Sequence, residues 1–211
     1  ATIDNSGTIG PAVASTVTSA TYAIVETGGA VIINNTGHIN GNISVASATF
    51  NNNAGGIWTV AGSSVFGNVS SIVNAGEIDL LNGASISVNG TGISNSGDID
   101  SWGAASITGT IVNSHLIEVH TGTLTLFGSL SGSGSVTVDK DATLKLEGTV
   151  SQTITFAGDG AALKIDTSDF GGSIAGFAAT DKIDLSSISY DVGTTTATYD
   201  PDTGNLVVSD A

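Results

Sequence analysis

A seven-residue pattern, Ile-x-Asn-x-Gly-x-Ile, recurs along the first 120 residues and limits the possible folds more than any other feature of the chain. Intact copies begin at Ile3, Ile33, Ile72 and Ile93, and variants run from Asn51 to Ile57 and from Ile111 to Ile117, the last with His115 in place of the glycine. The asparagines stand at positions 5, 35, 53, 74, 95 and 113, so four of the five intervals lie between 18 and 21 residues. A repeat of this length is typical of a solenoid in which each copy forms one turn.

Each copy combines two short strands of alternating apolar and polar residues with an Asn-x-Gly corner between them. Glycine adopts positive φ without a steric penalty, and Asn also tolerates left-handed conformations, so we expect positive φ at the corner. His115 fits this expectation because His is enriched among non-glycine residues at positive φ. A second corner recurs between the copies, and three serines that follow it are predicted to form a row of stacked hydroxyls: Ser64, Ser85 and Ser106.

These features predict an all-β protein, namely a right-handed parallel β-helix of about ten turns with about 18–21 residues per turn. Two internal stacks are expected, one of Ile72, Ile93 and Ile111 and one of Ile78, Ile99 and Ile117. The asparagines would form a hydrogen-bonded ladder, as stacked amide side chains do in cross-β structures. An antiparallel β-sandwich is the rival fold, but it does not require identical residues at a fixed spacing.

The sequence divides into two segments at residue 122. Residues 1–122 hold the regular turns, and residues 123–211 continue the β-helix with shorter or altered turns. Thr198 to Val208, with the turn Asp200-Pro201-Asp202-Thr203-Gly204, is predicted to form a hairpin. We expect this C-terminal segment to cap the coil, because an open solenoid end exposes strand edges.

The composition argues against several classes of protein. The 211 residues include 19 acids, four lysines and no arginine, with a formal charge of −15, which argues against nucleic-acid binding. No apolar run approaches the roughly 20 residues that span a bilayer, so no membrane-spanning segment is expected. Disulfides and thiolate metal sites are impossible because the chain has no cysteine. Without an initiator methionine or a signal peptide, the chain is expected to be a mature protein or an excised part of a longer one.

The repeat copies, such as Ile93–Ile99, resemble those of autotransporter passengers and filamentous-haemagglutinin-type adhesins, which are large secreted surface proteins of bacteria. Three further segments resemble parts of such exported proteins of Gram-negative bacteria: Gly128–Leu144, Thr180–Leu185 and Thr198–Leu206. The resemblance covers nearly the whole chain. It implies a non-enzymatic stalk or adhesive module, extracellular or at the cell surface, with a carbohydrate or a host or cell-surface protein as its partner.

Alignment of the copies places Glu77 next to Asp98, and Asp79 next to Asp100 and Glu118. Carboxylates one strand spacing apart repel each other unless solvent or a cation separates them. Because Ca²⁺ prefers oxygen ligands, Glu77, Asp79, Asp98 and Asp100 form a candidate calcium site on the surface. The alternative interpretation is a solvated acidic face on an acidic protein.

A carbohydrate-active β-helix enzyme is the first alternative function, because paired carboxylates can hydrolyse glycosides and pectate-lyase-like folds resemble this coil. Lyases of that type use an Arg or Lys base, whereas the lysines of this chain lie outside the acidic repeats, at Lys140, Lys145, Lys164 and Lys182. A pair such as Asp79 and Asp100 on a uniform ladder lacks the unlike environments that separate an acid from a base. We therefore expect no enzymatic activity. The second alternative is self-assembly through exposed end strands into filaments or surface layers.

The imidazoles and indoles are few. His38, His115 and His120 are predicted to fill turns or to be solvated, because no third metal ligand is evident beside the last two. Trp58 and Trp102 fall near corners, where they could fill corner volume or stack on a sugar, and we expect both to be buried.

Overall fold

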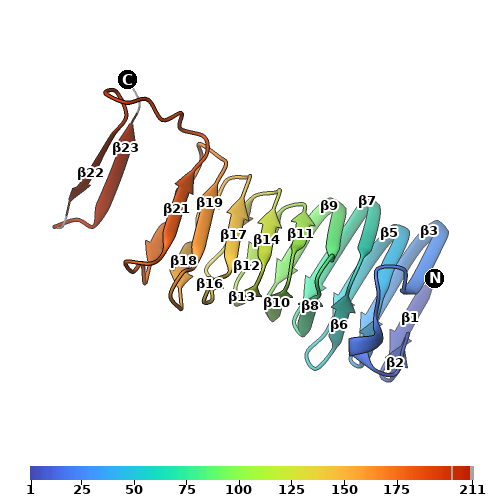
Figure 1. Cartoon of the computed structure of the whole chain (residues 1–211). Helices are drawn as coiled ribbons and strands as arrows, with labels where there is room; N and C mark the ends of the chain where they lie inside the picture. The colour runs from blue at the N-terminus through green and yellow to red at the C-terminus, as the bar shows by residue number, and fades with distance from the viewer. Residues whose placement is uncertain (201, 210–211) are drawn as a thin grey trace.

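The computed structural model describes residues 1–200 and 202–209 and forms a parallel β-solenoid of about eight turns, followed by a hairpin (Figure 1). Each turn adds one or two strands to the first of two sheets and one strand to the second, and a strand pairs with its equivalents in the preceding and following turns. The predicted all-β parallel β-helix is therefore confirmed. The sandwich is excluded because the strand pairs of both large sheets are parallel.

The first sheet, called sheet A, runs the full length of the solenoid. Its strands are β1 (Thr2–Asn5), β3 (Tyr22–Asn35), β5 (Asn42–Asn52), β7 (Ser63–Asn74), β9 (Ser85–Asn95), β11 (Ala105–Thr108), β12 (Ile111–Asn113), β14 (Thr123–Leu126), β15 (Leu130–Ser131), β17 (Thr143–Leu146), β19 (Ala162–Ile165) and β21 (Lys182–Leu185). Sheet B lies beside it and consists of β2 (Thr8–Ile9), β4 (His38–Asn40), β6 (Ile57–Val60), β8 (Glu77–Leu80), β10 (Asp98–Trp102), β13 (Leu116–Thr121), β16 (Ser135–Val138), β18 (Thr153–Phe156) and β20 (Ser173–Ala175).

The expected ten turns exceed the eight observed, because two segments lie outside the coil. The first turn takes 30 residues, since a 3-10 helix at Ala14–Thr16 and its flanking residues bulge out between β2 and β3. After β21 the chain leaves the coil and forms β22 (Thr196–Asp200) and β23 (Asn205–Ser209), an antiparallel pair. The expectation of ten turns came from dividing the 211 residues by a period of about 20, which counts both segments as part of the coil.

The predicted hairpin at Thr198 to Val208 is confirmed, although Pro201 of its turn lies outside the described residues. Within residues 1–200 and 202–209, the hairpin pairs with neither sheet of the solenoid. The capping role and the division at residue 122 stay predictions. No helix within the same residues is long and apolar enough to cross a bilayer.

Apolar side chains stack in rows inside the coil. Ile72, Ile93 and Ile111 are aligned in sheet A, and Ile78, Ile99 and Ile117 are aligned in sheet B, as predicted. All six are at most 1% exposed. Strand alternation turns every second residue inward, so one continuous core runs from Ile24 to Ile165.

A ladder of buried asparagines fills one corner of the core. The Nδ2 group of each Asn donates to Oδ1 of the Asn in the next turn, at 2.7–2.8 Å. The members are Asn5, Asn35, Asn52, Asn74, Asn95 and Asn113, each at most 9% exposed. The same amide groups also donate to backbone carbonyls across the corner, for example from Asn95 to Leu116. The ladder thus satisfies polar groups that would otherwise be costly to bury.

The predicted ladder was wrong at one member, because Asn52 takes the place assigned to Asn53. Phe50 aligns with Ile72 and Trp58 aligns with Ile78, so two aromatic residues replace the isoleucines of this copy. The corner between Asn52 and Gly56 is also longer than in the other copies. The Ile-based pattern could not identify this register.

The ladder ends at Gln152. In the turn after Asn113 the equivalent position is Gly132, which has no side chain. The longer Gln152 side chain, from the turn beyond, reaches past this glycine and accepts a hydrogen bond from Asn113 Nδ2 at 3.1 Å. Its own Nε2 donates back to the backbone oxygens of Asn113 and Ser131. Gln152 is 2% exposed and satisfies the last amide of the row.

The prediction of positive φ at the motif glycines was wrong. Gly37, Gly76 and Gly97 are absent from the residues with positive φ, and so is His115. A Cβ on Gly97 would instead lie 2.1 Å from the carbonyl oxygen of Gly76 in the preceding turn. At Gly37, Gly76 and Gly97 the corner therefore lies too close to the preceding turn for a side chain, whereas the corner with His115 accommodates one.

We expect Gly97→Ala to lower the free energy of unfolding by about 2 kcal/mol, because the added methyl group must push two turns apart. The matched control is Gly7→Ala, since Gly7 holds the same motif position in the first turn and a Cβ there meets nothing within 4 Å. Urea denaturation of both variants measures the difference. Equal losses at Gly7 and Gly97 would refute the steric explanation.

The predicted row of hydroxyls is correct for Ser85 and Ser106, which are aligned. It is wrong at Ser64, because Ser63 stands opposite Ser85. Ser64 points inward and its hydroxyl accepts a hydrogen bond from the backbone of Ile43.

Candidate functional site

The outer surface of sheet B carries a concentration of acidic side chains in the middle of the solenoid. In β8, β10 and β13 the apolar residues point inward, so the residues between them face outward. The next strand, β16, is followed directly by Asp139. We define the acidic face as Glu77, Asp79, Asp98, Asp100, Glu118 and Asp139.

The predicted alignments of these acids are confirmed. Glu77 stands opposite Asp98, and Asp100 lies between Asp79 and Glu118. Because parallel strands are about 4.8 Å apart, each carboxylate has another at close range along the solenoid axis.

The structure brings together three of the four predicted calcium ligands. Carboxylate oxygens of Glu77, Asp79 and Asp100 lie within 4.8 Å of one another. Asp98 does not belong to this group, and its carboxylate lies 3.5 Å from Nε2 of His115. Ca²⁺ takes six to eight oxygen ligands, so these carboxylates would need help from water. Calcium binding by Glu77, Asp79, Asp98 and Asp100 stays a prediction.

His120 lies in the same face and contacts three acids. Its Nδ1 is 2.9 Å from Asp139 Oδ2, and its Nε2 is 3.2 Å from Asp100 Oδ1 and 3.8 Å from Glu118 Oε2. The side chain is 19% exposed. The expectation that His120 fills a turn or is solvated is therefore wrong, because residues from three successive turns surround it.

Trp102 forms one wall of this group. Its indole stacks on the imidazole of His120, with ring centroids 3.9 Å apart and 15° between the planes. Its Nε1 donates to Asp79 Oδ1 at 3.3 Å. A register shift in the pairing of β10 with β13 places Trp102 opposite Thr121 and leaves His120 without a backbone partner in the pairing.

The predicted burial of the two tryptophans is correct for Trp58 and wrong for Trp102. Trp58 is fully buried, whereas Trp102 is 49% exposed. The difference follows from strand alternation, because Trp58 points inward from β6 and Trp102 points outward from β10.

Burial and mutual repulsion shift the titration of this face. Burial raises the pKa of Glu77, and the negative charges of Asp79 and Asp100 raise it further. Burial likewise raises the pKa of Asp79 and of Asp100, although hydrogen bonds from Trp102 and His120 respectively oppose the change. Burial lowers the pKa of His120, but the hydrogen bond to Asp139 and the charge of Glu118 outweigh it, so this pKa is raised overall. The acids around His120 therefore favour the protonated form of its imidazole.

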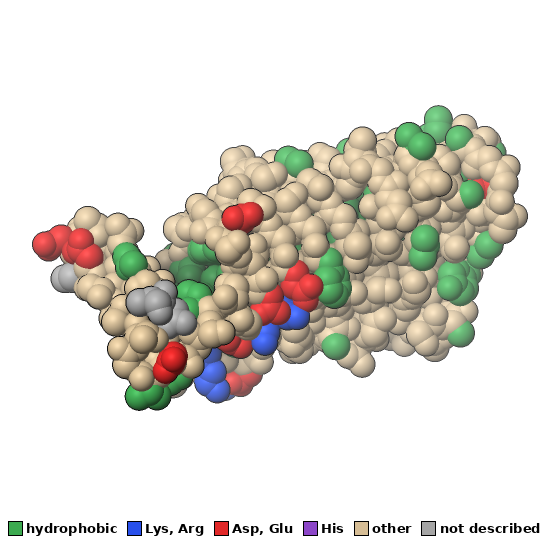
Figure 2. Space-filling model, turned by 90° about the horizontal axis from the view of Figure 1, so that it is seen from above, with side chains coloured by type: hydrophobic (Ala, Val, Ile, Leu, Met, Phe, Trp, Pro, Cys, Tyr) green, Lys and Arg blue, Asp and Glu red, His purple; other side chains and the backbone are tan. Residues whose placement is uncertain are grey.

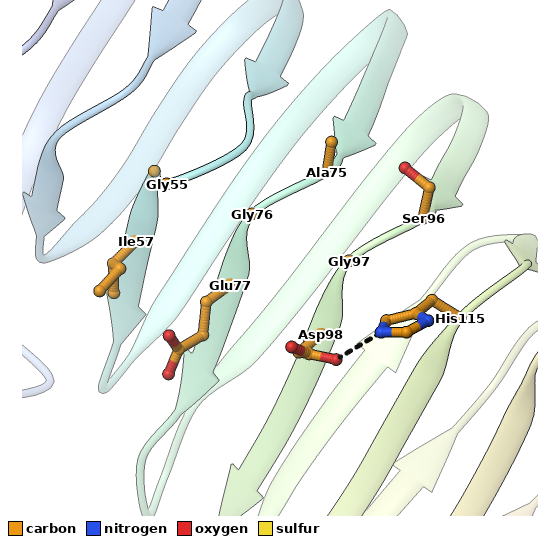
Figure 3. A pocket seen from close by; sticks show the side chains of 10 residues that line it. Gly55, Ile57, Ala75, Gly76, Glu77, Ser96, Gly97, Asp98 and His115 are labelled. Atoms are coloured by element: carbon orange, nitrogen blue, oxygen red, sulfur yellow. Dashed lines mark ion pairs between the residues drawn. The ribbon is translucent and has the colours of Figure 1, made fainter.

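A shallow hollow of about 340 Å³ borders the acidic face along the motif corners (Figure 3). The stacked glycines Gly76 and Gly97 form its floor, and Glu77, Asp98 and His115 stand at its rim (Figure 3). Figure 3 shows the Asp98–His115 contact at one end of this hollow. The hollow is open to solvent and lacks the enclosed walls that are usual in small-molecule sites.

Three of the four lysines lie elsewhere, on strands of sheet A toward the C-terminal end: Lys145, Lys164 and Lys182. Lys140 follows Asp139 in the turn after β16, and its Nζ is 3.3 Å from Asp141. Lys145 Nζ is 2.9 Å from Asp166, and Lys164 Nζ is 3.3 Å from Asp184. Figure 2 shows the basic and acidic side chains next to one another in this region. Lys140, Lys145 and Lys164 are thus paired with acids outside the acidic face.

Three members of the site were not predicted from the sequence, namely Trp102, His120 and Asp139. His120 could have been placed from the alternation of β13, because it lies two residues after Glu118 and must share its face. Asp139 could not, because the Ile-x-Asn-x-Gly-x-Ile pattern has ended before the turn that carries it.

Comparison with known proteins adds no assignment: no protein-family model, curated protein or solved structure matches this chain.

Proposed function

We propose that the chain is a non-enzymatic structural module of a secreted or surface-attached bacterial protein, acting outside the cell as a stalk or as part of an adhesive passenger. It holds a binding surface at a fixed distance and orientation. The observation that carries the proposal is the unbroken internal support of the coil. The asparagine ladder links every turn from Asn5 to Asn113, and the apolar rows continue beyond it.

The charge of the chain supports an exposed, solvated role. Eight acids and no lysine or arginine occur in residues 1–139. The N-terminal two thirds of one molecule therefore repel the same part of another, which favours solubility. The partner of such a module is a carbohydrate or a protein of a host or cell surface, contacted through the outer face of sheet B.

We expect the solenoid to behave as a stiff spacer in solution. Thr8 and Ser173 are exposed and belong to one outer row of sheet B, eight strand spacings apart. Spin labels on Thr8→Cys and Ser173→Cys should therefore give a narrow distance distribution centred at about 38 Å, broadened only by the label linkers. The chain has no native cysteine, so the labelling is specific. A broad or bimodal distribution in pulsed electron spin resonance would contradict a spacer function.

A carbohydrate-active enzyme is the second candidate, and one observation favours it. Half-exposed Trp102 lies beside Asp79 and Asp100, and an indole next to carboxylates is a common surface for binding sugar rings. The two carboxylates occupy neighbouring positions of a regular ladder on an open surface, which argues against a hydrolytic site.

A paired assay separates the two candidates. The chain, immobilised on a surface, is tested for binding to a panel of bacterial and host glycans, and the same glycans are incubated with it and analysed for new chain ends. A display module binds without shortening the glycan, and Trp102→Ala weakens that binding. Shortening that disappears in Asp100→Asn would establish the enzyme instead.

A further inference from the structure

His120, Asp100 and Glu118 bring three potential ligand atoms close together. His120 Nε2, a carboxylate oxygen of Asp100 and one of Glu118 all lie within 4.8 Å of one another. Ligands of a tetrahedral Zn²⁺ ion at about 2.0–2.2 Å are separated by about 3.3–3.6 Å. The two distances from Nε2, 3.2 Å to Asp100 and 3.8 Å to Glu118, bracket that range.

The imidazole is held in the orientation that a metal ligand requires. Asp139 Oδ2 contacts Nδ1 at 2.9 Å, and the indole of Trp102 covers one face of the ring. A metal-binding His commonly donates its other ring N–H to a carboxylate, which fixes the tautomer and leaves the ligating nitrogen free. When Nδ1–H donates to Asp139, the lone pair of Nε2 faces two carboxylates. Three acceptor atoms this close together repel one another, so the arrangement favours a positive species between them.

The chain offers no side-chain cation for this position. No lysine or arginine precedes Lys140, and Lys140 itself pairs with Asp141 at 3.3 Å. The positive species is therefore either a proton on Nε2 or a metal ion that replaces it. An imidazole with two carboxylates suits a transition metal and does not suit Ca²⁺, which takes oxygen ligands.

We propose that His120, Asp100 and Glu118 bind one divalent transition metal ion, of the Zn²⁺ class, on the outer face of sheet B, with Asp139 as the residue that positions the imidazole. The site joins two successive turns, since Asp100 lies on β10 and the other two ligands lie on β13. The fourth position stays open to water or to a donor group of a partner.

The test is calorimetric titration of the untagged chain with Zn²⁺, with Ca²⁺ titrated in parallel. We expect one saturable Zn²⁺ site per chain and a rise in the unfolding temperature with Zn²⁺. X-ray absorption at the zinc edge should show a shell of nitrogen and oxygen ligands with the outer-shell scattering of an imidazole. No saturable Zn²⁺ binding, or a Zn²⁺ site without imidazole, overturns the proposal.

Variants assign the ligands. His120→Gln and Glu118→Gln should each abolish saturable binding, whereas the control His38→Gln, which removes an exposed imidazole on β4, should leave it unchanged. If His120→Gln fails to fold, Glu118→Gln decides. Zn²⁺ binding that persists in both ligand variants, or that is lost in His115→Gln instead, overturns the assignment.

Asp139→Asn tests the positioning role. We expect Zn²⁺ affinity to fall about 10–100-fold while the unfolding temperature without metal stays the same. An unchanged affinity refutes this role. A lower unfolding temperature without metal would mean that Asp139 stabilises the fold and does not position the imidazole.

Discussion

Asn95→Ala is expected to lower the free energy of unfolding by about 3–5 kcal/mol, because it removes the middle of the buried ladder. Asn95 accepts a hydrogen bond from Asn74 Nδ2, and it donates to Asn113 Oδ1 and to the backbone oxygen of Leu116. Alanine leaves these three groups without their partner in a region closed to water, and each loss costs about 1–3 kcal/mol at most. Urea denaturation followed by circular dichroism measures the change.

The control for this prediction is Asn51→Ala. Asn51 also donates to another asparagine, Asn34, at 2.8 Å, but this pair lies on the outer surface of sheet A. Water replaces the lost hydrogen bond there, so the expected cost is below about 1 kcal/mol. If the two variants lose equal stability, burial does not determine the strength of the ladder.

Trp58→Ala is expected to cost about 3–5 kcal/mol, the range for removal of a large buried aromatic side chain. Trp58 packs edge-on against Phe50 and Phe66, with ring centroids 5.1 and 5.7 Å away, and its Nε1 donates to the buried oxygen of Gly41. The truncation therefore opens a cavity beside two phenylalanine rings and leaves a carbonyl without its donor.

Trp102→Ala is the matched control, because the same atoms are removed from a side chain that is 49% exposed on the neighbouring part of sheet B. Its expected cost is below about 1 kcal/mol. Each variant retains one tryptophan, so its fluorescence reports on that indole alone. The emission of buried Trp58, seen in Trp102→Ala, should lie at the shorter wavelength. A larger loss of stability from Trp102→Ala would show that the outer face, and not the core, supports these turns.

The alternation of apolar residues and the spacing of the asparagines were sufficient to predict a parallel coil and the alignment of Glu77 with Asp98. They could do so because parallel stacking repeats the same contact in every turn. The prediction failed where one turn departed from the pattern. The prediction took Asn53 in place of Asn52 because it searched for isoleucines at fixed positions. In this turn Phe50 and Trp58 occupy the inward positions that isoleucine holds in the other copies.

The candidate site was harder to predict than the fold. The acids on β8 and β10 lie within regular copies, so their proximity followed from the register. The group around His120 depends on the shifted pairing between β10 and β13 and on Asp139 in a later, irregular turn. Contacts of this kind arise from departures from the repeat, and the repeat itself contains no information about them.

The amide row has a direction, and this bears on how such a rod can change its length. Every asparagine inside the row accepts a hydrogen bond from the previous turn and donates one to the next. A duplicated turn, such as residues 75–95 inserted after Asn95, would therefore continue the row without a missing hydrogen bond. The row does not continue beyond Gln152, because its amide nitrogen donates to backbone oxygens of earlier turns and not to a side chain of the next turn. Lengthening by whole-turn duplication is therefore compatible with the N-terminal half and blocked at the glutamine.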